Sequence, residues 1–190
     1  MFGSNHPFGG RDGVMLAERV SAYFGEVRVV VNDLRMNVAT LAPIFIPINK
    51  HGRQSSEYSK LYNETFAGDT PIITFPAGLC SRRKKGVVCD LDWKHSFIKQ
   101  AVANKRDVVP VYFDGTLSNF FYRLANLRTR LGIKANIEML YLVDEMFKQC
   151  GQHFEIVIGR PIPWQSLEGG SPRTKAAEVK EAAYSLKKRE

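Results

Sequence analysis

The segment Ser4–Gly13, with the sequence SNHPFGGRDG, carries the residue types that acid–base chemistry needs. It contains His6 and Asp12, with two glycines between them. Because glycine lets a short loop fold back on itself, the Asp12 carboxylate can hold one imidazole nitrogen of His6. The other nitrogen is then free to take a proton from a hydroxyl group, without an enzyme nucleophile. The pattern predicts a catalytic His6–Asp12 pair that activates a hydroxyl.

The same two residues also have a purely structural interpretation. Asp12 precedes an amphipathic segment, Gly13–Phe24, and an acidic side chain at the start of a helix is stabilised by the helix dipole. In that case Asp12 serves only the helix, and His6 is an ordinary loop histidine. Residue types and spacing alone leave both interpretations open.

Composition limits the class of protein and its partners. The chain has 190 residues, 44% hydrophobic and 24% charged, which is ordinary for one globular domain. Its net charge of +8 favours a polyanionic partner, either a nucleic acid or an anionic membrane surface. Since no nucleic-acid-binding motif accompanies this charge, we expect the membrane and no nucleic acid.

Location follows from apolar runs and cysteines. No apolar run approaches the ~20 residues of a transmembrane helix, so an enzyme acting on lipid would work from the membrane surface. The 3 cysteines have no CxxC spacing, which argues against a disulfide framework or a zinc site and favours a reducing compartment. We expect a cytoplasmic protein, peripheral on the inner face of the cell membrane, with no bound metal.

Apolar runs alternate between strand-like and helix-like patterns along the chain. Short runs rich in β-branched or aromatic residues predict strands at Val27–Val31, Pro71–Phe75, Val108–Phe113, Ile137–Leu142 and Phe154–Ile158. Segments between or after them predict helices at Gly13–Phe24, Ser56–Phe66, Trp93–Asn104, Ser118–Leu131 and Lys175–Lys187. This alternation predicts an α/β fold, with a mainly parallel or mixed central sheet flanked by helices.

Ligands of such sheets collect at the loops that leave the carboxyl ends of the strands. The loops so placed are Ser4–Asp12, Asn49–Gly52, Pro76–Arg83 and Asp114–Ser118. Phe2-Gly3-Ser4 resembles the end of a strand whose beginning is absent. We therefore expect residues 1–190 to form a single domain that lacks N-terminal elements.

The loop around His6 resembles the HxxxxD motif of glycerolipid acyltransferases of the PlsC type, the 1-acylglycerol-3-phosphate acyltransferase family. The Asn-His-Pro opening and the glycine after Asp12 strengthen the resemblance, although 5 rather than 4 residues separate His6 from Asp12. The form NHPxGGxDG resembles a subgroup from Bacteroidetes often labelled haemolysin-like or glycerol acyltransferase. The resemblance extends over nearly the whole chain and implies a lipid O-acyltransferase of that fold, with no cofactor.

Two further segments resemble the substrate-binding blocks of this family. Phe75–Arg82 resembles the FPEGTRS block, with Ala77, Leu79 and Cys80 in place of Glu, Thr and Arg. The resemblance implies that the acceptor head group binds at Gly78, Leu79, Cys80, Ser81 and Arg82, whose backbone N–H groups could also face an oxyanion. Pro47–Gly52 occupies the place of the second block, where Lys50 would supply a point charge instead of an arginine.

The implied reaction moves a fatty acyl group from an acyl carrier protein or coenzyme A thioester to the hydroxyl of a lysolipid. Lysophosphatidate is the usual acceptor of the family. Because Lys50 and Cys80 replace two phosphate-reading arginines, lysophosphatidate is weakened as the acceptor, and a lyso-amino-acid lipid with a free fatty hydroxyl becomes a serious candidate. A Pro-Gly turn after a strand needs no ligand, and Cys80 beside a basic run is not assigned a nucleophilic role.

Two other classes of function stay open at this stage. A catalytically silent membrane-associated fragment would keep the fold and the basic surface without the chemistry. A basic nucleic-acid-binding module is supported only by charge and scattered aromatic residues. Acyl transfer that depends on His6 separates the enzyme from both.

Overall fold

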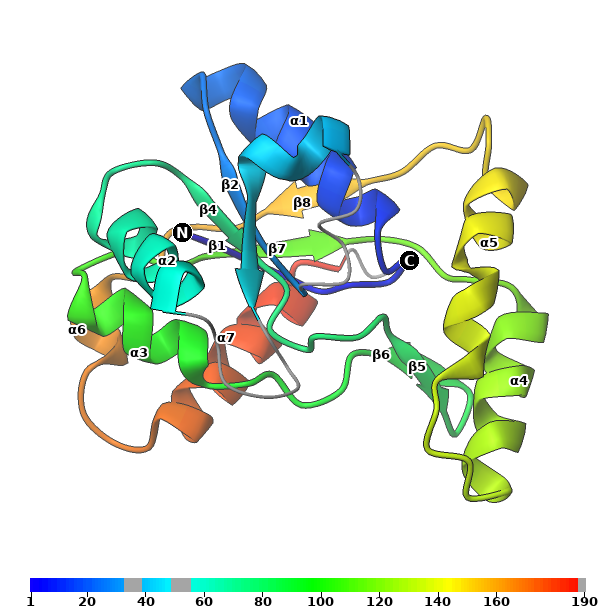
Figure 1. Ribbon diagram of the computed structural model, residues 1–190. Helices are drawn as coiled ribbons and strands as arrows, with labels where there is room; N and C mark the ends of the chain where they lie inside the picture. Colours follow the sequence, from blue (N-terminus) through cyan, green and yellow to red (C-terminus); the bar gives the residue numbers. More distant parts are fainter. Residues whose placement is uncertain (33–38, 49–55, 188–190) are drawn as a thin grey trace.

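The computed structural model describes residues 1–32, 39–48 and 56–187 (Figure 1). Within this part of the chain, a six-stranded sheet has the order β3-β2-β4-β1-β7-β8. Neighbouring strands pair in parallel except β7 and β8, which are antiparallel. The strands are β1 (Phe2–Ser4), β2 (Arg28–Asn32), β3 (Phe45–Ile48), β4 (Ile72–Thr74), β7 (Val109–Phe113) and β8 (Ile156–Ile158). The predicted α/β fold with a mainly parallel, mixed sheet is confirmed.

Helices cover both faces of the sheet because the buried strands are apolar on both sides. On one face, Leu16, Ala17 and Val20 of α1 (Arg11–Phe24) pack against β1, β2, β4 and β7. The other face carries α2 (Ser56–Ala67), α3 (Ser96–Ala103), α6 (Trp164–Leu167) and α7 (Pro172–Ser185). Strand β2 shows the alternation directly, since Val29 and Val31 face α1 while Val30 packs on the other side.

Among the predicted strands, Ile137–Leu142 is wrong. Residues Ile137–Tyr141 form a 3-10 helix, η3, which continues into α5 (Leu142–Lys148). The inward-facing side chains are Met139 and Leu142, which are three positions apart, as on a helix. Glu138 is fully buried in this segment and forms ion pairs with two arginines. A pattern of apolar residues in the sequence does not reveal that an acidic residue among them is buried and paired.

Three strands, which lie in two segments of the chain, were not predicted. The run Leu41–Ile48 divides into a 3-10 helix, η2 (Ala39–Ile44), and the edge strand β3, which tolerates Pro47 because one side of an edge strand needs no N–H donor. The basic run after Ser81 forms a hairpin of β5 (Arg82–Lys84) and β6 (Val87–Cys89). Lys85 and Gly86 both have positive φ angles, 49° and 83°, which is the geometry of a two-residue hairpin turn.

Beyond the carboxyl edge of the sheet, residues 118–150 form an α4–α5 unit, which contains α4 (Asn119–Arg130), η3 and α5 (Figure 1). Two buried acidic residues hold it. Glu138 binds Arg82 and Arg128 at 2.7 and 2.8 Å. Glu145 accepts hydrogen bonds from the backbone N–H and the hydroxyl of Ser118, at 2.6 and 2.7 Å, and so joins α5 to the start of α4.

Glu138→Gln is expected to destabilise the protein strongly. The change keeps the shape but leaves Arg82 and Arg128 without their counter-charge in a buried position, which costs about 3–5 kcal/mol. Urea denaturation measures the difference in the free energy of unfolding. The exposed pair Lys60–Glu64 supplies the control, since Glu64→Gln should cost less than about 1 kcal/mol. Equal effects of the two substitutions would contradict a structural role for Glu138.

Candidate active site

The loop after β1 is fixed to the end of β7 by the Asn5 side chain, whose amide forms the two hydrogen bonds that a backbone peptide group would form. The Asn5 side-chain amide donates to the Phe113 carbonyl at 2.9 Å, and its carbonyl accepts from the Phe113 N–H at 2.6 Å. This pair of bonds continues the β1–β7 ladder beyond Ser4. His6 therefore starts from a backbone as firmly placed as the strand itself.

His6 and Asp12 meet, as predicted from the loop. The imidazole Nδ1 lies 3.1 Å from Asp12 Oδ2, close but not aligned as a hydrogen bond. Gly9 makes the return possible with a φ of 74°, and a side chain there would press on Cys80 and Leu142. The five residues between them thus form a loop that brings the His6 side chain to Asp12, which lies in the first turn of α1.

Asp12 is fully buried and is held as an anion. Burial alone would raise the pKa of this carboxyl group. The electrostatic attraction of the nearby His6 imidazole and the hydrogen bonds from the N–H groups of Phe8 and Gly13 outweigh burial, so the pKa lies below its ordinary value of 3.8. An ionised Asp12 can orient the imidazole and stabilise it when it takes up a proton.

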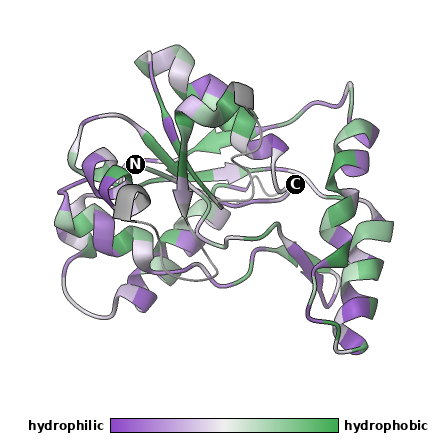
Figure 2. Ribbon diagram, in the orientation of Figure 1, coloured by the Kyte–Doolittle hydropathy of each residue, from purple (hydrophilic) through white to green (hydrophobic). Residues whose placement is uncertain are grey.

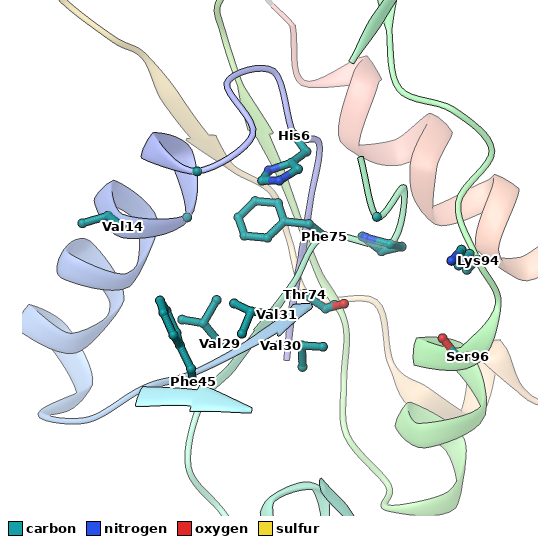
Figure 3. Close-up of a pocket in the computed structure, with 14 residues that line it drawn as sticks. His6, Val14, Val29, Val30, Val31, Phe45, Thr74, Phe75, Lys94 and Ser96 are labelled. Carbon is teal, nitrogen blue, oxygen red and sulfur yellow. The ribbon is translucent and has the colours of Figure 1, made fainter. Parts of the chain in front are cut away.

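A cavity of about 150 Å³ opens beside His6 and has two chemically different sides (Figure 3). The His6 ring lies against Phe75, with ring centroids 4.3 Å apart. Figure 3 shows apolar side chains of α1, β2 and β3 on one side, and Lys94 and Ser96 on the other. The apolar side consists of Val14, Val29, Val30, Val31 and Phe45. The cavity therefore combines a histidine, an apolar wall and a lysine.

The segment after β4 contributes Phe75, Pro76 and Gly78 to the cavity. Gly78 has a φ of 69°, and its N–H donates to the Phe75 carbonyl at 2.9 Å. The Gly78 N–H is thus engaged within its own turn and does not point at a substrate oxygen. Leu79 is half-buried and does not line the cavity.

Cys80 and Arg82 face away from the cavity. The Cys80 side chain is buried among Phe8, Phe113 and other core residues, and burial raises the pKa of its thiol despite the nearby Arg82. The Arg82 guanidinium binds Glu138 at 2.7 Å and the Cys80 sulfur at 3.0 Å. These contacts join the segment after β4 to the α4–α5 unit.

Ser81 lies directly beside the His6 loop. Its N–H donates to the His6 carbonyl at 2.9 Å, and its hydroxyl donates to Asp90 Oδ1 at 2.6 Å. The His6 N–H donates to the same Asp90 oxygen at 3.2 Å. Asp90 therefore clamps the two loops together at the backbone of the histidine.

Asp90 is the residue of the site that sequence analysis missed. Its other oxygen accepts from the Trp93 indole at 2.9 Å, and its backbone N–H donates to the Tyr184 hydroxyl at 2.8 Å. Burial raises the pKa of Asp90, and the hydrogen bonds that favour its charge only partly offset this. Its signal in the sequence was weak, because Val87–Trp93 contains two acidic residues, Asp90 and Asp92, and the apolar residues around them do not show which one is buried.

Two lysines, Lys50 and Lys94, bear on the predicted substrate site. Lys50, predicted to bind substrate, lies outside the described residues. Lys94 was not predicted, but the structure places it on the polar side of the cavity, directly before α3. Its signal in the sequence was weak, because one lysine before a helix is a common surface feature.

A family model described as acyltransferase matches residues 1–189. The chain belongs to the acyltransferase family. Two relatives, from Bacteroides thetaiotaomicron and Phocaeicola vulgatus, are named lyso-glycine lipid O-acyltransferase, and each is 50% identical to this acyltransferase over 187 residues. The aligned region covers 97% of this chain in both cases, and 69% and 67% of the two relatives. The resemblance to PlsC-type lysolipid acyltransferases is confirmed, and the protein is an O-acyltransferase.

No helix in the described part of this acyltransferase is long and apolar enough to cross a bilayer.

Asp12→Asn should lower stability in a pH-dependent way. Since the pKa of Asp12 is lower in the folded state, its ionised form stabilises the fold above pH ~4, and this stabilisation disappears as pH falls through the folded pKa. The free energy of unfolding should drop by about 1–3 kcal/mol at neutral pH, and this difference from wild type should shrink as pH falls below ~4. Urea denaturation across this pH range measures it, with exposed Asp92→Asn as control. A difference that does not change with pH would contradict the assignment.

Proposed function

We propose that this acyltransferase transfers a fatty acyl group from an acyl carrier protein or coenzyme A thioester to the free hydroxyl of a lyso-glycine lipid. His6 acts as general base, and Asp12 orients it. The observation that carries this proposal is the cavity, where His6, with Nδ1 against the buried Asp12, meets an apolar wall and a lysine. The names of the two relatives support the acceptor.

The reaction needs one base in one orientation. With Nδ1 directed to Asp12, His6 Nε2 takes the proton of the acceptor hydroxyl as its oxygen attacks the thioester carbonyl carbon. The carbon–sulfur bond then breaks, and the imidazolium returns the proton to the leaving thiolate. The ionised Asp12 stabilises the imidazolium between these two steps. The Phe75 ring against the imidazole limits its rotation.

The two sides of the cavity match the two parts of a lyso-glycine lipid. Its fatty chain would lie along the apolar side formed by Val14, Val29, Val31 and Phe45. A glycine acylated on its nitrogen keeps a carboxylate, which would bind Lys94, with Ser96 at the start of α3 beside it. The acceptor hydroxyl then lies between these ends, at His6.

A single negative charge suits this site better than a phosphate. Of the described residues that line the cavity, Lys94 is the cation. Cys80 stands where the family has an arginine, and Arg82 is committed to Glu138. We therefore place lyso-glycine lipid before lysophosphatidate as the acceptor, and an anionic membrane surface as the place where the enzyme meets it.

His6→Ala should reduce acyl transfer about a thousandfold or more, because the general base is lost. The assay uses labelled acyl carrier protein thioester, with lyso-glycine lipid or lysophosphatidate dispersed in detergent. The exposed His95→Ala, at the start of α3, should retain activity and serves as the matched control. Circular dichroism verifies that each variant is folded.

The two acceptors and the variant separate the possible results. Transfer to lyso-glycine lipid that depends on His6 would support the whole proposal. Transfer to lysophosphatidate alone would refute the acceptor but keep the mechanism. Retained activity in folded His6→Ala protein would refute the mechanism.

Lys94→Met should raise KM for lyso-glycine lipid about tenfold or more and change kcat much less, because it removes a contact to the head group and leaves the base in place. The methyl ester of the same acceptor has no carboxylate, so wild type and Lys94→Met should use it equally well. Lys99→Met, one turn further along α3, serves as the matched control. An equal loss with acid and ester would show that Lys94 acts on the fold and not on the carboxylate.

A further inference from the structure

The α4–α5 unit carries large apolar side chains on its surface. Figure 2 shows apolar residues on both helices of the unit. The most exposed are Leu140 at 80%, and Leu131 and Phe147 at 65% each. Single exposed apolar residues are ordinary, whereas a group on one short unit is typical of an interaction surface. We call six of them the outer apolar face: Phe120, Leu127, Leu131, Leu140, Val143 and Phe147.

The spacing of these residues puts them in two stripes. On α4, Leu127 and Leu131 lie 7 and 11 positions after Phe120, so all three share one side of the helix. Val143 and Phe147 lie 3 and 7 positions after Leu140 along η3 and α5, which again places them on one side of a helix. The stripes border each other, since the Phe120 ring contacts the Tyr141 ring with centroids 5.1 Å apart.

Nothing in the attachment of the unit requires the outer apolar face. Its inner side is held by the buried Glu138 and Glu145, and by the buried Phe121, Tyr122 and Ala125 of α4. The exposed apolar residues are therefore not needed to hold the unit in place.

A surplus of positive charge accompanies this face. In residues 118–150, all of which the structure describes, the exposed cations are Arg123, Arg130, Lys134 and Lys148, and the exposed anion is Asp144. The β5–β6 hairpin packs beside α4, with Arg83 bonded to Asn119, and adds the exposed Lys84 and Lys85. Apolar side chains mixed with arginine and lysine are typical of helices that lie in the head-group region of an anionic membrane.

We propose that the outer apolar face docks this acyltransferase on an anionic lipid bilayer. Its apolar side chains would enter the acyl-chain boundary, while the cations pair with lipid head groups. The inference rests on the proposed function, because a lipid acceptor makes the membrane the expected partner. An acidic carrier protein would complement the cations, but the six apolar side chains favour lipid.

The position of the unit connects docking to the site. On its inner side, Leu142 lies against Gly9, between His6 and Asp12 in the sequence. Arg11, at the start of α1, donates to the Met146 carbonyl at 3.2 Å and stacks on Phe154. The docked unit would thus rest directly on the catalytic loop and hold it near the membrane surface.

Sedimentation with phosphatidylcholine vesicles, with and without phosphatidylglycerol, tests the proposal. The wild-type chain should bind the anionic vesicles, and the double variant Leu140→Ser/Phe147→Ser should bind them about tenfold more weakly or worse. Arg123→Gln/Lys134→Gln should bind more weakly and show a smaller salt dependence than wild type. Tyr23→Ser, which removes an exposed aromatic ring from α1, should bind like wild type.

Four results would overturn the proposal. The first is a wild type that does not bind anionic vesicles, and the second is a Leu140→Ser/Phe147→Ser variant, folded by circular dichroism, that binds them like wild type. Loss of carrier-protein binding with unchanged vesicle binding would make the face a protein-docking surface. A wild-type dimer that this variant converts to a monomer, without losing vesicle binding, would make it an interface between copies.

Acyl transfer to a detergent-dispersed acceptor keeps this inference separate from the proposed function. The Leu140→Ser/Phe147→Ser variant should retain wild-type turnover there while losing activity on vesicles. Absence of transfer by the wild type in detergent would refute the proposed function, whereas vesicle binding would still decide the docking surface.

Discussion

The buried carboxylate of Asp90 is the contact on which the arrangement of the site depends. A charged group in the protein interior is costly unless several donors surround it, and here the donors come from three different segments. The His6 N–H, the Ser81 hydroxyl and the Trp93 indole all converge on it. None of these segments can shift without leaving a buried polar group unpaired. The histidine is therefore positioned through its backbone first and its imidazole second.

The loop between His6 and Asp12 shows how a one-residue departure from a family motif is absorbed. Phe8 turns into the core and packs edge-on against Phe113 and Phe154, while its N–H binds the Asp12 carboxylate. Gly115 lies against the Phe8 ring, where any side chain would overlap it. The extra length is thus taken up by an anchored aromatic residue. With this longer loop, His6 Nδ1 lies 3.1 Å from Asp12 Oδ2.

Those features that depend on local pattern could be predicted from the sequence. The strands around Val29 and Val111 and the helix α1 followed from apolar periodicity, and the loop glycines indicated the meeting of His6 with Asp12. Features that depend on distant partners could not. Glu138 lies in an apolar run that forms a helix instead of a strand, and its partners are arginines 56 and 10 positions before it in the sequence. Asp90 and Lys94 acquire a role only when the fold brings His6 beside them.

Arg82 illustrates the same limit within the predicted substrate segment. The residue has the charge that an anion-binding role requires, and it ends the segment that resembles a family block. Its guanidinium is nevertheless buried against Glu138 and Cys80 and faces away from the cavity. The direction of a side chain in a short segment depends on the neighbouring unit, which sequence spacing does not specify.

The α4–α5 unit separates the residues that attach it from those that face outward. Glu138, Glu145 and Ser118 hold it in place, and none of them belongs to the outer apolar face. Substitutions on the outside are thus released from the selection that maintains the fold. Descendants of this enzyme can change the surface they present, one residue at a time, while inheriting the same catalytic loop. The outer apolar face, which the proposed docking uses, is therefore where adaptation to membranes of different composition would be recorded.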